Sequence, residues 1–136
     1  MTDPHEVFSS GRRFWGRLFV VYIPGVGAII AVIVALAQRS DAQGSPSEVV
    51  RENARWAANW ALSVTLYGFD VLVAAASIAV ITGEAPVDRQ PTAWVIGPSL
   101  VLAAVGIYCL VTLIRGCVIA DRVVHRPALA IPFFRS

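Results

Sequence analysis

The sequence predicts an all-α integral membrane protein with three transmembrane helices. Hydrophobic residues make up 57% of the chain and the mean hydropathy is +0.67. Charged residues make up only 15%, against about 25% in soluble domains. The apolar residues form three long runs, and a soluble core of 136 residues could not bury so much apolar surface. A lipid bilayer is therefore expected to cover much of the chain.

Composition also limits the function and the location. The net charge of +2 is too small to suggest a nucleic-acid partner, and no basic tract with interleaved aromatic residues is present. All eleven basic residues are arginine, which together with abundant alanine and valine favours a GC-rich bacterial genome. The expected location is the bacterial plasma (inner) membrane, with a single domain that crosses it several times.

Residues 1–17 are predicted to form an interfacial N-terminal tail, because arginines and aromatic residues alternate there. A three-helix transmembrane domain is expected over residues 18–126, with its first span over about residues 18–38. This apolar run is longer than the roughly 7–15 residues of a signal-peptide core, so the span should be retained. Pro24 inside it predicts a kink.

Small residues recur every four positions in the first span, at Gly27, Ala31 and Ala35. This spacing lets two helices approach closely, although an alanine-rich helix would show it as well. The sequence leaves both interpretations open.

The second span is predicted over about residues 57–82, within a longer helix from Pro46 to Thr82. Ser45 is the expected N-cap, and Gly83 the expected C-terminal cap. Such a helix is about 55 Å long, against a hydrocarbon core of about 30 Å, so its first turns should project beyond the membrane. Trp56 and Trp60 are expected at the interface.

The third span is predicted over about residues 94–116, after a short loop. Its helix should continue until the Arg126-Pro127 step ends it, leaving residues 127–136 as an interfacial C-terminal tail. Two cysteines, Cys109 and Cys117, lie roughly 12 Å apart on this helix and cannot form a disulfide with each other.

One line of polar side chains follows the second helix. At 100° per residue its members fall within about 20° of each other; they are Glu52, Asn59, Ser63, Asp70 and Ser77. A carboxyl group deep in a membrane usually faces a partner, a cavity or a proton path. In apolar surroundings it is expected to be neutral and to donate a hydrogen bond. The antiparallel register makes Tyr108 and Thr112 the expected partners of Asp70.

The same register predicts a polar clasp on one side of the membrane. It places Asn59 level with Arg115, and Glu52 level with Arg122. Because the two arginines are seven residues apart, they share one face of the third helix. We therefore expect these four side chains to pair across the two helices.

No pattern of catalytic residues is apparent. The sequence has no Cys/His cluster with zinc spacing, no glycine-rich phosphate loop and no serine with a credible base. His125 is expected near a helix end, as a surface or dipole-complementing residue. We therefore expect no enzymatic activity, no cofactor and no metal.

Arginine counts in the flanks predict the orientation. The first loop and the C-terminal segment together carry seven arginines, whereas the N-terminal tail and the second loop carry four. This favours a cytoplasmic C-terminus and an N-terminus outside.

Two stretches resemble a known pattern. Residues 50–63 contain Glu52, Arg55, Asn59 and Ser63 at the spacing E-x-A-R-x-A-x-N-x-x-x-S, and residues 120–135 resemble the A-x-x-x-x-G-x-x-x-x-x-P ending, with valine or histidine where glycine is common. The chain is thus similar to a bacterial family of three-span membrane proteins of unknown function. That family is distantly similar to the channel component of the chloroplast inner-envelope import translocon. The resemblance implies a membrane fold over roughly residues 15–135.

The predicted function is that of a non-catalytic integral membrane subunit with an accessory or assembly role. Its polar line and small-residue faces would pack with a second copy or with other membrane protein subunits. The alternative is a channel- or translocon-like transport component with a polar path along the second helix. Replacing Asp70 with asparagine separates the two, because it should be silent in a scaffold and should abolish flux in a proton-coupled path.

Overall fold

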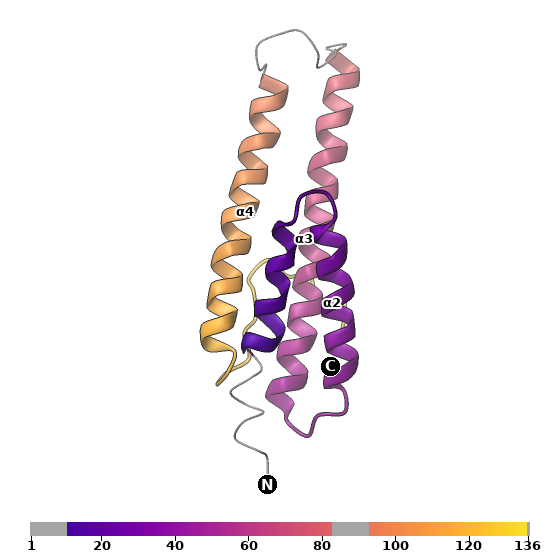
Figure 1. The fold of residues 1–136 in the computed structure, drawn as a ribbon. Coiled ribbons are helices and arrows are strands. Elements are labelled where there is room, and N and C mark those ends of the chain that lie inside the picture. Colours follow the sequence, from indigo (N-terminus) through magenta and orange to yellow (C-terminus); the bar gives the residue numbers. More distant parts are fainter. Residues whose placement is uncertain (1–10, 83–92, 136) are drawn as a thin grey trace.

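The computed structural model describes residues 11–82 and 93–135, and within them the regular structure is entirely helical. Two long antiparallel helices form the axis of the molecule, and shorter helices and the last residues wrap around one half of it (Figure 1). The elements in chain order are η1 (Gly11–Trp15), η2 (Gly16–Tyr22), α2 (Gly27–Ala42), α3 (Glu48–Thr82) and α4 (Ala93–Ile119).

Helices α3 and α4 are each long and apolar enough to cross a membrane. They correspond to the predicted second and third spans. The second helix starts at Glu48, two residues beyond the predicted Pro46, and it is helical up to Thr82, the last residue described before the gap. Ser45 contributes to this start, because its Oγ accepts a hydrogen bond from the Ser47 amide over 3.3 Å. The expected cap Gly83 lies outside the described residues.

The predicted first span over residues 18–38 does not form one continuous helix. The chain rises through η2, turns at Pro24 and Gly25, and descends through α2 (Figure 1). Proline cannot continue the hydrogen bonding of a helix, and Gly25 has a φ of +81°, a conformation that side chains disfavour. The expected kink is therefore a complete reversal, and the segment is a helical hairpin.

Small residues hold the two arms of this hairpin close together. A Cβ on Gly27 would overlap the backbone oxygens of Val20 and Val21. Ala31 and Ala35 follow on the same face of α2 and are almost fully buried. The small residues are therefore packing residues, which confirms the first of the two sequence interpretations.

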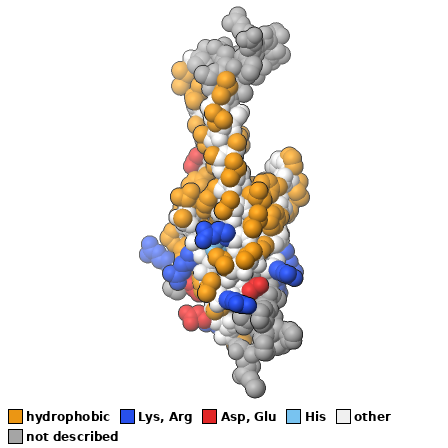
Figure 2. Space-filling model, turned by 90° about the vertical axis from the view of Figure 1, so that its left-hand side faces the viewer, with side chains coloured by type: hydrophobic (Ala, Val, Ile, Leu, Met, Phe, Trp, Pro, Cys, Tyr) orange, Lys and Arg blue, Asp and Glu red, His pale blue; other side chains and the backbone are white. Residues whose placement is uncertain are grey.

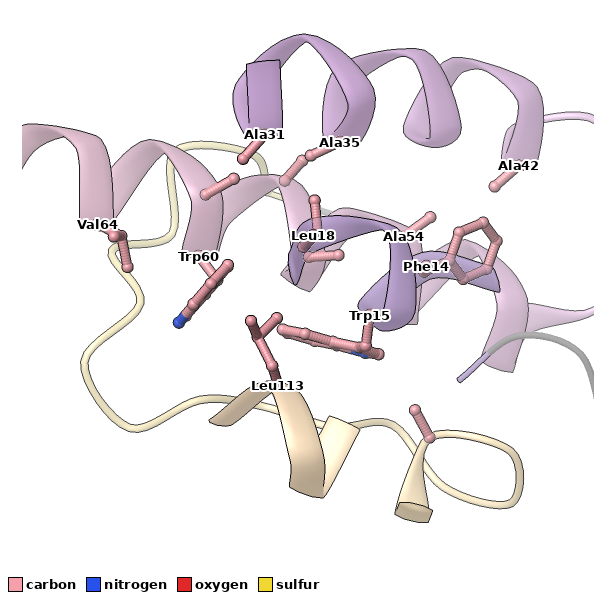
Figure 3. Packing of buried hydrophobic residues seen from close by; sticks show 14 of the residues in the cluster. Phe14, Trp15, Leu18, Ala31, Ala35, Ala42, Ala54, Trp60, Val64 and Leu113 are labelled. Atoms are coloured by element: carbon pink, nitrogen blue, oxygen red, sulfur yellow. The ribbon is translucent and has the colours of Figure 1, made fainter. Parts of the chain in front are cut away.

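The core lies where the hairpin meets α3 and α4. Phe14, Trp15 and Leu18 from the N-terminal arm pack with Trp60 of α3 and Leu113 of α4 (Figure 3). The rings of Trp15 and Trp60 meet edge to face, with centroids 6.0 Å apart. Phe14, Trp15 and Trp60 were expected at headgroup depth, but all three are buried because the hairpin folds onto the long helices.

Helix α4 ends at Ile119, not at the predicted Arg126. Beyond it the chain turns and runs back beside α3, so residues 127–135 are not the separate interfacial tail that the sequence suggests (Figure 1). The physical reason is a competing hydrogen-bond partner. Asn53 binds the backbone of Ala120 and Val123, which a continuing helix would have used internally.

Most charged side chains of the visible face gather toward one end of its coloured part, while the face beyond them is mostly apolar apart from an acidic side chain (Figure 2). The start of η1, the turn after α2 and the segment after α4 all lie toward this end (Figure 1). The start of η1 and the segment after α4 therefore lie at the same end of the molecule, whereas the sequence suggested opposite ends, because a hairpin returns the chain to the end it came from. Ten of the eleven arginines belong to elements of this end, and Arg89 lies outside the described residues.

Candidate functional site

Five polar side chains hold the segment after α4, and we call them the polar clamp. They are Asn53, Asn59, Ser63 and Tyr67 of α3, and Tyr108 of α4. Each of them bonds to backbone atoms of the segment 120–134, which is irregular and needs partners for its amides and carbonyls. The clamp is therefore the most extensive polar arrangement among the described residues.

Asn53 anchors the near end of the segment. Its Oδ1 accepts a hydrogen bond from the His125 amide over 2.9 Å, and its Nδ2 donates to the carbonyls of Ala120 and Val123 over 3.0 and 3.3 Å. The side chain is fully buried. One amide thus satisfies three backbone groups at the point where the chain leaves α4.

Asn59 and Ser63 anchor the far end. Asn59 holds Phe134 by both of its backbone groups, since Oδ1 accepts from the amide over 2.9 Å and Nδ2 donates to the carbonyl over 3.3 Å. Ser63 Oγ accepts from the Ile131 amide over 2.8 Å and donates to the Asn59 carbonyl over 2.7 Å. The side-chain amide of Asn59 thus bonds to the N–H and the C=O of one residue, as a neighbouring strand does in a β-sheet.

Two tyrosines hold the middle of the segment at Leu129. Tyr67 donates its hydroxyl proton to the Leu129 carbonyl over 2.8 Å, and the Leu129 amide donates to the Tyr108 hydroxyl over 3.4 Å. Because one tyrosine comes from α3 and the other from α4, this contact ties the segment to both long helices.

The structure places the predicted clasp residues apart. Glu52 forms an ion pair with Arg55 within α3, and Asn59 hydrogen-bonds to the backbone of Phe134. The side chains of Arg115 and Arg122 are exposed. The predicted register is nevertheless correct, since Asn53 reaches the backbone of Ala120 and Val123. The segment after α4 occupies the space between the helices that the arginine side chains were expected to enter.

Asp70 also differs from the prediction. It is exposed and has no hydrogen-bond partner among the described residues, while its expected partner Tyr108 bonds to Leu129. Ser77 is exposed too and bonds within its own helix, to the Val73 carbonyl. The polar line of α3 therefore has two parts: a buried one that binds the chain itself, and an exposed one beyond the hairpin.

Sequence reasoning missed Asn53 and Tyr67. A usable signal was present in the prolines Pro127 and Pro132, which prevent the last residues from forming a helix. Backbone groups left without helical partners must find side-chain partners when they pack against the protein. The face of α3 that carries side-chain amides and hydroxyls supplies these partners.

His125 lies beneath the clamp and is buried, not at the surface as expected. Its ring meets the Trp15 ring edge to face, with centroids 4.9 Å apart, and its Nε2 has no hydrogen-bond partner in the described part of the chain. Burial lowers the pKa of His125 below its usual 6.5, and the charge of Arg115 lowers it further, while a hydrogen bond to the Thr112 backbone opposes both. The folded protein therefore favours the neutral ring.

This lowered pKa predicts that stability falls in mild acid. Above pH 6.5 the ring is neutral in both states; below it the unfolded chain binds a proton that the folded chain resists, so stability declines as the pH drops. Thermal unfolding in detergent at pH 7.5 and 5.5 should show the decline, because aspartate and glutamate stay mostly ionised over this range. The variant His125→Gln should lose much of it, and an unchanged pH dependence would contradict the assignment.

Two long helices that are apolar enough to cross a membrane, with a helical hairpin against one half of them, are typical of a helical membrane protein. The model of the magnetosome magnetite crystal formation protein family matches residues 13–134, so the chain belongs to this family of bacterial membrane proteins. No curated protein and no solved structure matches the chain. The comparisons do not bear on the predicted similarity to the chloroplast translocon component, which stays a prediction.

Proposed function

We propose that the protein is a non-catalytic accessory subunit of a bacterial membrane, which acts in magnetite crystal formation by associating with itself or with a larger membrane complex. The family description supports the process. The association is supported by the exposed part of α3, and above all by the carboxyl group of Asp70 on that surface.

Beyond the hairpin, few of the described residues surround α3 and α4. Val80 and Ile81 are more than four-fifths exposed, and most neighbouring apolar side chains are exposed as well. Lipid can cover such side chains, but it cannot satisfy a carboxyl group. Asp70 lies on this surface without a partner among the described residues, so a second protein chain would supply what the bilayer cannot.

No observation favours the transport alternative. Asn59 and Ser63, which were expected to line a polar path along the second helix, are buried and bonded to the last residues of the chain. Within the described residues of one chain, this leaves Asp70 and Ser77 as the outward-facing members of the polar line.

For the orientation we propose that the charged end faces the cytoplasm. Ten arginines belong to that end, and an excess of arginine in the flanks of spans marks the cytoplasmic side. The proposal agrees with the cytoplasmic C-terminus expected from the sequence and moves the N-terminal stretch to the same side.

The test is a mild-detergent pull-down of the tagged protein from its native membrane, with stoichiometry measured by mass spectrometry. We expect a stoichiometric partner, or a second copy, with the wild type and its loss with Asp70→Leu. Leu72→Ala changes another exposed position, on the opposite face of α3, and should keep the partner. Electron microscopy of cells that carry Asp70→Leu should show altered crystals. The proposal would be refuted if the wild-type protein were monomeric and the cells that carry Asp70→Leu made normal crystals.

A further inference from the structure

An apolar groove runs between α2 and α3 on the outside of the hairpin. Its volume is about 470 Å³. The lining is almost wholly apolar and comes from both helices and from the last residues of the chain: Ile29, Val32, Ile33, Leu62, Thr65, Leu66, Phe69 and Phe133. The groove opens sideways, toward the surroundings of the helices.

A polar pocket of about 110 Å³ lies between the same two helices, toward the charged end. It is lined by Arg39, Gln43, Arg51, Glu52 and Arg55. Three guanidinium groups and one carboxylate leave a charge of +2. Glu52 is paired with Arg55, whose Nε is buried and has no hydrogen-bond partner within the described residues. The pocket therefore has positive charge to offer an anion.

The groove and the pocket lie on the same face of each helix. At 100° per residue, Arg51 and Arg55 of α3 fall within an arc of about 60° that also holds Leu62, Leu66 and Phe69. On α2, Arg39 falls within about 80° of Ile29 and Val32, and so does the C-cap residue Gln43 just beyond the helix. Phe133 lines the groove, while its neighbour Phe134 lies under the Arg39 guanidinium, 4.0 Å from the ring centroid. The two sites are therefore successive parts of one crevice.

We propose that this crevice binds one anionic phospholipid, with its phosphate against Arg39, Arg51 and Arg55 and an acyl chain in the groove. The ligand has to be an amphiphile, because one end of the crevice is cationic and the other apolar. The depth fits: Leu62 and Phe69 lie roughly 10 and 21 Å along α3 from Arg55, and one leaflet of hydrocarbon is about 15 Å thick. A basic pocket between membrane helices on the arginine-rich side is a usual place for an anionic headgroup.

The occupant is a lipid and not a second copy of the chain because of the charge. The carboxylate of the crevice itself, Glu52, is already paired with Arg55, whereas one lipid supplies both an anionic group for the arginines and an apolar chain for the groove. Anionic lipid headgroups lie at that depth in any bacterial membrane leaflet facing the cytoplasm.

The test is a count of bound lipids by native mass spectrometry on the detergent-purified protein. The probes are phosphatidylglycerol, phosphatidylcholine, phosphatidylglycerol with six-carbon chains, and inorganic phosphate. We expect one tightly bound phosphatidylglycerol, with phosphatidylcholine, the short-chain lipid and phosphate all much weaker. Removing charge with Arg39→Gln and Arg51→Gln should weaken phosphatidylglycerol about five-fold per arginine. Arg17→Gln, an exposed arginine at the same end, is the matched control.

A second pair of variants tests the groove. Ile33→Trp should fill it and weaken both long-chain lipids, whereas Ile107→Trp, at a similarly exposed position on α4, should not. Arg39→Lys keeps the charge and should keep the lipid preference, which separates loss of charge from loss of the Phe134 contact. Equal binding of the two long-chain lipids, or phosphate binding as tight as lipid binding, would overturn the proposal. So would a dimer that Ile33→Trp abolishes.

Discussion

Replacing Asn53 with alanine is expected to lower the free energy of unfolding by about 3 kcal/mol or more. The change removes three hydrogen bonds at once, to His125, Ala120 and Val123, and it does so at a fully buried position. Backbone groups that lose a buried partner cost about 1–3 kcal/mol each. Denaturant unfolding of the purified protein in a fixed detergent measures the loss.

The matched control is Ser77→Ala, on the same helix. Ser77 is exposed and bonds within its own helix, so its loss should change stability by less than about 0.5 kcal/mol. Limited proteolysis adds a local measurement, because the segment after α4 should become sensitive in the Asn53 variant before the long helices do. If Asn53→Ala unfolds like the wild type, the clamp does not hold the segment.

Replacing Gly116 with alanine is expected to destabilise the protein by about 1–3 kcal/mol, as overpacking of a filled core does. A Cβ at this position would overlap the ring of Trp15, which is buried between α4, Trp60 and His125. Trp15 belongs to η1, so the ring cannot move without shifting the N-terminal arm of the hairpin. Unfolding by tryptophan fluorescence should show a lowered midpoint and an altered native spectrum.

Gly106→Ala is the control on the same helix. Its Cβ would meet nothing within 4 Å, so alanine should be neutral or slightly stabilising there, as expected for glycine in a helix interior. Equal effects of the two substitutions would mean that the close approach of Trp15 to α4 does not limit packing.

The sequence was sufficient to predict the two long helices and their relative register. Both are long apolar runs, and a short connection between them makes them antiparallel, so residues 53 and 120–123 had to lie near each other. The hairpin was not predicted, because an apolar run containing Pro24 is compatible with a kinked span as well as with a reversal. Hydropathy measures how apolar a segment is and carries no information on its direction.

The site was predicted in part for a similar reason. Periodicity correctly placed Asn59 and Ser63 on one face of α3 but could not say what faces them. Opposite charges made Arg115 and Arg122 the obvious partners. The actual partners are backbone atoms of residues 120–134. Pro127 and Pro132 indicate that this segment is not helical, but no residue pattern says which side chains its backbone groups meet.

The clamp also sets an order of events during biosynthesis. Asn53, Asn59 and Ser63 leave the ribosome long before the residues that satisfy them, because the rest of α3 and the whole of α4 are made in between. Until residues 120–134 emerge, the amides of α3 must remain hydrated or borrow other partners, and the hairpin has an incomplete surface to fold against. The fold therefore cannot close until residues 120–134 have been made, which is after both long helices.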